Sequence, residues 1–278
     1  MRYFTDPACS ASWAAEPLVR RLMWEFGDSL SFTWIMGGLA RDYTYARDVF
    51  PWLLAHWLEV ASETRMPIDP LLWKEGPITT TYPACMAVKA AQEQAGDGGY
   101  RYLRTVREGL LCFRRKLDNT EALVEAAREA GLNVERFRID LQSHAIVEAF
   151  GADLEATRTV PEEARAAGKV ADAHGSGERL PFPSAVFAAE DGSEHGLYGR
   201  AGYEDLRAAA VSAGAEAAGQ EPPGALDALR RFGRMATREV EEVCGLPEPR
   251  AQAELWRLAS EWTVKPVRVL TGWLWEVA

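Results

Sequence analysis

One cysteine stands where its position predicts chemistry. Residues 2–5 are rich in aromatic and β-branched side chains, which favours a strand, and Asp6-Pro7 ends that strand. Cys9 follows, and residues 13–22 then carry apolar side chains at roughly helical spacing. Backbone N–H groups at the start of a helix lack intrahelical partners, and together with the helix dipole they favour a thiolate. Cys9 is therefore a candidate nucleophile, and the alternative is a small, buried, unreactive cysteine.

The residues around Cys9 also resemble a known motif. Residues 5–17 read TDPACSASWAAEP, which resembles the D-P-x-C-x-x-C-W-A-x-E-P segment of DsbA-like thioredoxin-fold proteins. Ser12 stands where that family has its second cysteine. In a dithiol the second thiol resolves the mixed disulfide that the first one forms, and Cys9 alone cannot do this. The resemblance therefore implies one-thiol chemistry or a retired active site, with Ser12 capping the helix or donating a hydrogen bond to a Cys9 thiolate.

Composition limits the class of protein. The 278 residues are 47% hydrophobic, which is typical of an ordered globular chain with an ample core. A formal net charge of −10 disfavours nucleic acid as a partner. We expect no secretory leader, because Asp6 and Pro7 interrupt the N-terminal residues, and no apolar run approaches the roughly 20 residues that span a bilayer. We therefore expect a cytoplasmic protein without membrane contact.

The cysteines do not predict a disulfide framework or a metal site. Four of them are spread through the chain, at Cys9, Cys85, Cys112 and Cys244. No C-x-x-C pair or cysteine–histidine pair has the spacing of a zinc site. We expect no metal and no resident cofactor.

The order of the predicted elements extends the resemblance. Residues 29–36 alternate like a strand and complete a right-handed βαβ unit, and residues 40–170 are mostly helical, with the clearest helix at 118–131. The DsbA-like family inserts a helical domain between the second and third strands of the thioredoxin fold, and residues 130–137 (AGLNVERF) resemble part of that domain. The fold class predicted is therefore α/β: a thioredoxin-fold domain of residues 1–39 and 171–219 with residues 40–170 inserted.

The resemblance also implies a partner for Cys9 across the fold. In thioredoxin folds a cis-proline faces the reactive cysteine and leaves the preceding backbone free to hold an extended substrate. By resemblance Pro183 takes that place, with Phe182 before it. Pro181 is the competing candidate, and two ordinary trans turn prolines are the plain alternative.

Residues 220–278 predict a separate small lobe. A linker rich in proline leads to three short helices and a hairpin, the outline of a winged helix. This invites a DNA-binding interpretation, but residues 221–278 hold 8 Arg and Lys against 9 Asp and Glu, a net charge of −1. DNA contact needs a basic face, so we expect the tryptophans of this lobe to pack internally or against a protein partner.

Two functions fit these observations. The first is a thiol–disulfide oxidoreductase or isomerase working through Cys9, with Ser12 holding the thiolate and Trp13, Phe182 and Pro183 contacting a protein or small disulfide substrate. Glutathione or another small thiol would then have to resolve the intermediate. The second is a non-catalytic adaptor, because residues 73–91 resemble cytoplasmic members of the family that bring a protein to a ClpXP-type protease. Kinship with glutathione-dependent isomerases of this fold is weaker, since those carry serine at the first position.

The surface beside Cys9 separates the two functions. An exposed groove lined by Trp13 and Phe182 favours substrate chemistry. A filled groove, with an apolar patch elsewhere on the surface, favours an adaptor.

Overall fold

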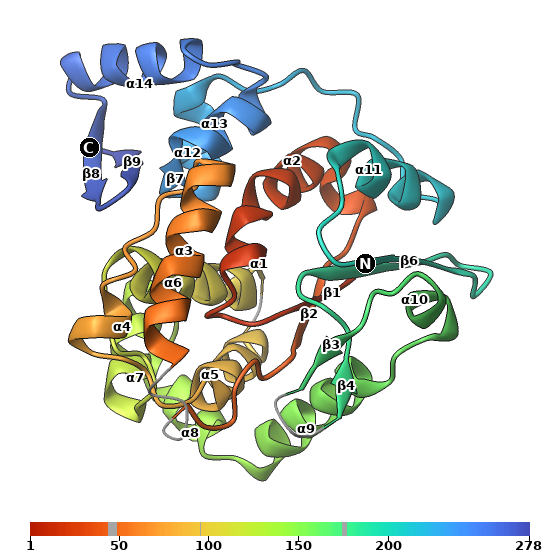
Figure 1. Ribbon diagram of the computed structural model, residues 1–278. Coiled ribbons are helices and arrows are strands. Elements are labelled where there is room, and N and C mark those ends of the chain that lie inside the picture. Colours follow the sequence, from red (N-terminus) through yellow and green to blue (C-terminus); the bar gives the residue numbers. More distant parts are fainter. Residues whose placement is uncertain (44–48, 95, 174–176) are drawn as a thin grey trace.

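The centre of the fold is a four-stranded mixed sheet. The computed structural model describes residues 1–43, 49–94, 96–173 and 177–278. The strands β1 (Arg2–Thr5), β2 (Thr33–Met36), β5 (Ser184–Ala188) and β6 (Glu194–Tyr198) lie in the order β2-β1-β5-β6. β2 is parallel to β1, and β5 is antiparallel both to β1 and to β6 (Figure 1). The parallel pair confirms the predicted βαβ unit, and the sheet is that of the expected thioredoxin fold.

The helix after Cys9 differs from the prediction. Instead of one helix over 13–22, the chain forms α1 (Ser10–Ala14) and α2 (Glu16–Phe26), separated at Ala15. Pro17 lies in the first turn of α2, where a missing N–H breaks no hydrogen bond but prevents α1 from continuing. The spacing of the apolar residues did not reveal this break.

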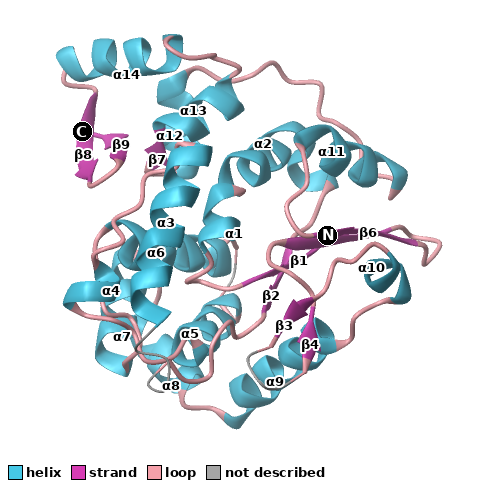
Figure 2. Cartoon of the chain, in the orientation of Figure 1, coloured by secondary structure: helices cyan, strands magenta, loops and turns pink. Residues whose placement is uncertain are grey.

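The inserted segment is helical, as expected, and its helices lie beside the central sheet (Figure 2). Its helices are α3 (Phe50–Thr64), α4 (Leu72–Glu75), α5 (Tyr82–Gln92), α6 (Gly98–Cys112), α7 (Thr120–Glu129), α8 (Val134–Leu141), α9 (His144–Arg158) and α10 (Glu162–Ala166). A small hairpin of β3 (Ala171–Asp172) and β4 (Glu178–Arg179) returns the chain to β5, and α11 (Tyr203–Ser212) follows β6.

Side-chain caps fix the ends of several helices. The predicted helix at 118–131 is α7, whose N-cap Asn119 accepts a hydrogen bond from the Ala122 N–H. Gly131 follows it with φ of +72°, a conformation that costs glycine least. Ser143 caps α9 in the same way, and that helix is one that the sequence pattern missed.

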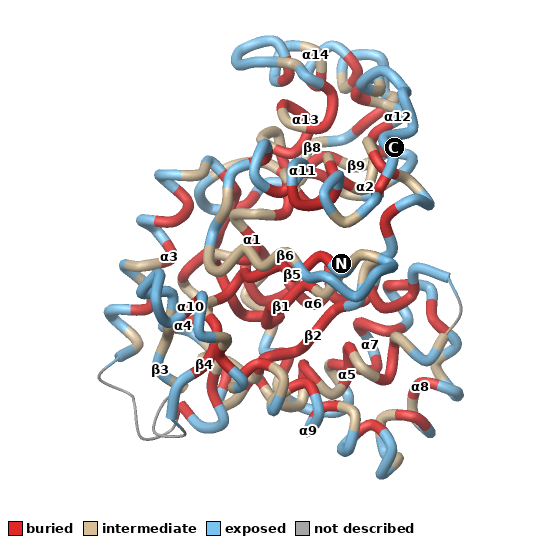
Figure 3. The backbone as a smooth tube through the Cα atoms, turned by 90° about the vertical axis from the view of Figure 1, so that its right-hand side faces the viewer, coloured by how far each residue is buried: buried red, intermediate tan, exposed pale blue. Residues whose placement is uncertain are grey.

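Residues beyond 220 form a lobe with a core of its own. It contains α12 (Ala225–Phe232), α13 (Thr237–Cys244) and α14 (Arg250–Ser260), with strands β7 (Met235–Ala236), β8 (Val264–Val269) and β9 (Gly272–Val277) in the order β7-β9-β8. Leu229, Val240, Leu255 and Trp275 are among its buried core residues. Buried stretches alternate with exposed ones along the backbone of this lobe (Figure 3). The predicted three helices and hairpin are present, while the winged-helix designation and the domain boundaries stay predictions.

A buried cluster of charges joins this lobe to the rest of the chain, the thioredoxin-fold domain with its helical insertion, which we call the body. Arg104 of α6 donates two hydrogen bonds to Glu239 of α13, at 2.7 and 2.8 Å. Glu239 also lies 3.2 Å from Arg20 of α2, and Glu16 of α2 pairs with both Arg104 and Arg107. All five side chains are almost completely buried. Two arginines of the body thus share a buried carboxylate of the lobe.

The Glu16 carboxylate of this cluster is held ionised. Burial by itself raises the pKa of Glu16, but Arg107, Arg104 and Arg20 together bring it below its ordinary value. The Tyr100 hydroxyl adds a hydrogen bond to Glu16 at 2.8 Å. Removing one partner from such a group leaves a buried charge without compensation, which is far costlier than losing a surface pair.

Neutralising Glu239 tests the cluster. We expect Glu239→Gln to lower the free energy of unfolding by about 3 kcal/mol, because Arg104 and Arg20 lose a buried partner. The matched control is Glu242→Gln on the same helix, since Glu242 pairs with the partly exposed Arg21 and Arg238. We expect the control to cost less than about 1 kcal/mol. Urea unfolding measures both, and equal losses would contradict the assignment.

The cluster also predicts a dependence of stability on pH. The pKa of Glu16 is lower in the folded chain than its ordinary value of 4.5, so its contribution is complete above that value and is lost as the pH falls. We expect the difference in free energy of unfolding between the wild type and Glu16→Gln to be constant near neutral pH. Below pH about 5 the difference should narrow. If the difference in free energy of unfolding grew on acidification, the pKa of Glu16 would be raised in the folded chain, which would contradict the assignment.

Candidate functional site

Cys9 lies at the position that the sequence predicts, between a strand and a helix. It is the N-cap of α1, and its Sγ accepts a hydrogen bond from the Ser12 N–H at 3.4 Å. Its own N–H donates to the Asp6 carbonyl at 3.2 Å, which closes the turn after β1. The thiol is therefore held at the start of the helix by backbone contacts on both sides.

The loop before β5 faces this thiol. The peptide bond between Phe182 and Pro183 is cis, and the bond before Pro181 is not, as the resemblance implied. The Cys9 Sγ lies 3.9 Å from the Phe182 carbonyl oxygen. The structure thus brings Cys9, Phe182 and Pro183 together from residues more than 170 apart in the chain.

The groove beside Cys9 is filled by side chains of the protein itself. Cys9 is 7% exposed and Phe182 is 8% exposed. The Phe182 ring lies on Gly37, so closely that a Cβ on that glycine would come within 1.8 Å of the ring. The Arg179 guanidinium covers the ring at 4.3 Å from its centroid. Of the two surfaces that separate the candidate functions, the structure has the filled one.

Trp13 does not line a groove, contrary to the expectation. Its side chain is completely buried, and its indole N–H donates to the Pro67 carbonyl at 3.0 Å. The Arg104 guanidinium lies 4.2 Å from the ring centroid. Trp13 therefore ties α1 to the insertion and to the buried charge cluster, and it offers no surface to a substrate.

Ser12 contributes its backbone and not its hydroxyl to the thiol. The predicted Ser12 cap is wrong, because Cys9 itself is the capping residue of α1. The Ser12 Oγ is buried and has no hydrogen-bond partner among the described residues. The catalytic roles assigned to Cys9 and Ser12, and the substrate contacts assigned to Phe182 and Pro183, stay predictions.

A buried carboxyl that sequence reasoning missed orders the turn before Cys9. Asp6 accepts hydrogen bonds from the N–H groups of Ala8 and Leu39, at 2.8 and 2.7 Å, and from the Thr81 hydroxyl at 2.9 Å. The Cys85 thiol donates to it at 3.3 Å. Burial raises the pKa of Asp6 despite these donors. The sequence indicated only that Asp6-Pro7 ends a strand. The contacts of Asp6 with Thr81 and Cys85 of the insertion depend on the tertiary fold, so the sequence could not reveal them.

The other thiols are buried and none is in a disulfide among the described residues. Burial raises the pKa of Cys85 and Cys112 well above the ordinary value, and the pKa of Cys244 to about 12. Such thiols stay protonated and react slowly. The described residues also contain no group of three or more metal-binding side chains.

Comparison with known proteins identifies the family of the chain and proteins similar to it. A family model described as thioredoxin matches residues 3–161. The ClpXP adapter protein SpxH of Bacillus subtilis is 25% identical over 276 residues, which cover 98% of this chain and 87% of that one. The SpxH of Halalkalibacterium halodurans is 32% identical over 161 residues, covering 56% of this chain. That second alignment spans only about half, 53%, of the relative's length.

Solved structures share the fold. A putative protein disulfide isomerase from Nitrosomonas europaea has a TM-score of 0.60 at 19% identity, covering 76% of this chain and 95% of that one. The cytosolic disulfide reductase DsbM from Pseudomonas aeruginosa has a TM-score of 0.53 at 20% identity, covering 70% and 87%. Among the helices of the described residues, none has the length and apolar character needed to cross a membrane.

The filled groove predicts how Cys9 reacts. We expect Phe182→Ala to raise the rate of Cys9 alkylation by iodoacetamide at least about tenfold, because it removes a large side chain from the buried cluster that contains the thiol. Phe187→Ala is the control, since Phe187 is buried on the other face of β5 and its loss destabilises without opening the groove. Mass spectrometry of the labelled peptide measures both rates. Equal rates in the two variants would mean that Phe182 does not shield Cys9.

Proposed function

This chain belongs to the thioredoxin family, in its DsbA-like branch, and we propose that it serves there as a protein-binding adaptor for a ClpXP-type protease. In this proposal the chain binds a client protein and presents it to the protease, and Cys9 takes no chemical part. The cytoplasmic location predicted from the sequence belongs to the same proposal.

The filled groove at Cys9 is the observation that carries the proposal. A thiol that exchanges disulfides with a protein must meet an extended substrate chain beside the cis-proline. Here Cys9 and Phe182 are both buried, the Phe182 ring packs on Gly37, and Trp13 is buried as well. Loss of the second cysteine at Ser12 is what a binding protein tolerates and a dithiol enzyme does not.

The extent of the similarity to adaptors supports the same proposal. The B. subtilis relative aligns with 98% of this chain, so the alignment includes most of the C-terminal lobe. That lobe is fixed to the body through the buried pairs of Arg104 and Arg20 with Glu239. A lobe held in one position on a thioredoxin fold enlarges the surface available to a protein.

The surface of the lobe fits a protein partner better than DNA. On α14, Arg257 is engaged by Glu254 and by Glu261, at 2.7 and 2.6 Å. Those pairs leave the helix little free positive charge for phosphates. Trp262, at the end of the same helix, is 87% exposed, and exposed tryptophans are typical of protein interfaces.

Protein turnover in cells of the source organism tests the proposal. We expect deletion of the gene to lengthen the half-life of one client, or a few, at least about threefold, and inactivation of the ClpXP-type protease to lengthen the same half-lives. Cys9→Ser should restore normal turnover, because the proposal assigns binding and not thiol chemistry to the chain. Pulse-labelling with mass spectrometry measures the half-lives. Clients that persist with Cys9→Ser as they do in the deletion would contradict the adaptor role.

A one-thiol exchange enzyme is the second candidate, and the contact of Cys9 with the cis-Pro183 loop favours it. The Cys9 thiolate would attack a substrate disulfide, form a mixed disulfide and release one substrate thiolate. Glutathione thiolate would then attack the mixed disulfide, regenerate Cys9 and leave glutathione bonded to the substrate sulfur. Glutathione-dependent turnover of a disulfide substrate above a Cys9→Ser blank would support this candidate. Without glutathione, Ser12→Cys should then release the second substrate thiol in a single turnover, because the introduced thiolate attacks the Cys9 sulfur of the mixed disulfide and the pair ends as an internal disulfide.

A further inference from the structure

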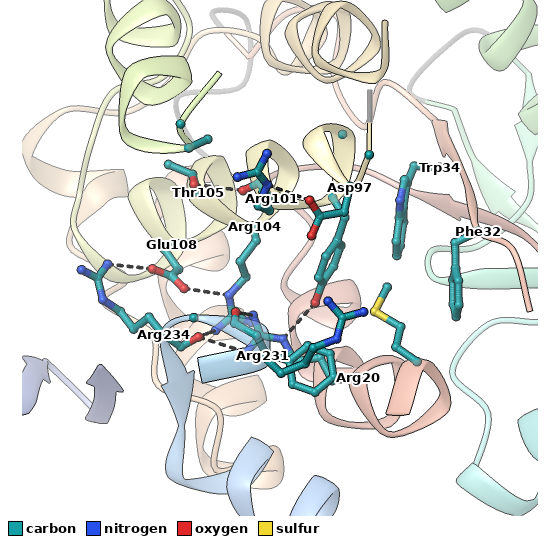
Figure 4. A pocket seen from close by; sticks show the side chains of 18 of the residues that line it. Arg20, Phe32, Trp34, Asp97, Arg101, Arg104, Thr105, Glu108, Arg231 and Arg234 are labelled. Atoms are coloured by element: carbon teal, nitrogen blue, oxygen red, sulfur yellow. Dashed lines mark hydrogen bonds and ion pairs between the residues drawn. The ribbon is translucent and has the colours of Figure 1, made fainter. Parts of the chain in front are cut away.

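A large pocket lies between the thioredoxin body and the start of the C-terminal lobe, apart from Cys9. It has a volume of about 1080 Å³ and is lined by β2, α2, α6 and the segment from α12 to β7 (Figure 4). None of Cys9, Phe182 and Pro183 lines it. Its floor is built by Arg20 and Arg104 of the buried charge cluster.

Stacked aromatic rings form one wall of the pocket. Trp34 of β2 lies between Phe32 and Tyr100, with ring centroids 5.7 and 5.1 Å away and interplanar angles of 16° and 19°. Figure 4 shows Phe32 and Trp34 side by side with their rings nearly parallel. Phe32 is the half-buried ring of the row, while Trp34 and Tyr100 are buried. The row therefore presents an apolar face on which a further aromatic or large apolar side chain can pack.

The rest of the lining is rich in arginine, although the chain as a whole carries a formal charge of −10. Among the described residues that line the pocket, seven arginines face five carboxylates. The floor arginines are fully engaged: Arg20 donates to Tyr100 and to the carbonyls of Phe232 and Arg234. Glu239 and Glu16 pair with the floor arginines from outside the lining, so the cationic groups left for a ligand are those at the rim.

Two arginines at the rim are available to a ligand. Arg231 is exposed, and its guanidinium has no hydrogen bond or ion pair with any residue that the structure describes. The Arg231 Cζ lies 5.8 Å from the centroid of the Phe232 ring. Arg101 pairs with Asp97 at 2.8 Å, but both side chains are about half exposed, so that pair is worth little and exchanges readily.

We propose that this pocket binds an acidic segment of a protein partner. The segment places an aromatic or large apolar side chain against Phe32 and its carboxylates at Arg231 and Arg101. This rests on the proposed adaptor function and names the chemistry of the segment that a client or the protease supplies. A peptide fits better than a single small anion for two reasons. The volume lies at the upper end of the roughly 300–1,000 Å³ range of small-molecule pockets, and the rim arginines come from two elements, α6 and α12.

The contact would also connect binding to the architecture of the chain. Arg231 belongs to the lobe, whereas Phe32 and Arg101 belong to the body. A segment that contacts all three is held by both parts at once, and the floor beneath it is the charge cluster that already joins them.

Fluorescence anisotropy with designed peptides tests the proposal. The probe is a fluorescein-labelled ten-residue peptide of alternating Glu and Asp with one central Trp, titrated with the full chain. The comparison peptides replace that Trp with Ala, or replace the acids with Lys. We expect the acidic Trp peptide to bind at least about tenfold more tightly than either comparison peptide, and to weaken as salt is raised.

Variants locate the site. Arg231→Glu should weaken binding of the acidic Trp peptide about tenfold by placing like charge at the rim. Phe32→Ala should weaken it about fivefold, and should remove the preference for Trp over Ala. Arg250→Glu is the matched control, since Arg250 is an exposed arginine of the same lobe outside the pocket, and it should change affinity less than twofold.

The outcomes distinguish this proposal from the adaptor function. Equal binding of the three peptides, equal effects of Arg231→Glu and Arg250→Glu, or binding of a fluorescent ATP analogue with no binding of the peptide would each overturn the pocket assignment. If client turnover still depends on the chain in that case, the adaptor role stands and only the pocket fails. If the acidic peptide binds in the pocket and client turnover does not depend on the chain, the pocket stands and the adaptor role fails.

Discussion

The buried pairing of Arg104 with Glu239 is the contact on which the rest of the structure depends. Its two charges come from residues 135 apart in sequence and are both buried, so each requires the other. Through it α13 is seated on α2 and α6, and Arg20 reaches the carbonyls of Phe232 and Arg234 in the same place. These buried contacts fix the position of the lobe on the body. Arg20 and Arg104, which make them, also form the floor of the large pocket.

The same arrangement explains how a thiol site can persist without an open groove. The turn from β1 into α1 is held by Asp6, and Trp13 is wedged between Pro67 and Arg104. These contacts position Cys9 opposite the cis-proline loop whether or not it reacts. Phe182 packs on Gly37 in the same buried cluster as Cys9, which leaves the thiol little exposed. A fold inherited from thiol chemistry can in this way serve as a rigid frame for binding, which is the role that we propose.

Local signals predicted much of this fold. The strand at 2–5, the helix caps and the position of Cys9 follow from short stretches of sequence, and the cis-proline at 183 followed from the resemblance. The burial of Trp13 could not be predicted, because it depends on Pro67 and Arg104, which the sequence does not place beside it. From the sequence, Glu239 is likewise one of several charged residues on a helix. Its burial against Arg20 and Arg104 depends on the docking of α13 on α2 and α6, which the sequence does not show. The pocket depends on that same long-range docking.

One measurement tests the central claim most directly: the half-life of a client in cells that express Glu239→Gln or Cys9→Ser at the abundance of the wild type. The account predicts that Cys9→Ser leaves the half-life unchanged, because no thiol chemistry is needed. Glu239→Gln should lengthen it towards the value of the deletion, because the lobe is no longer fixed to the body. Normal turnover with Glu239→Gln and slow turnover with Cys9→Ser would contradict the account and return the function to the thiol.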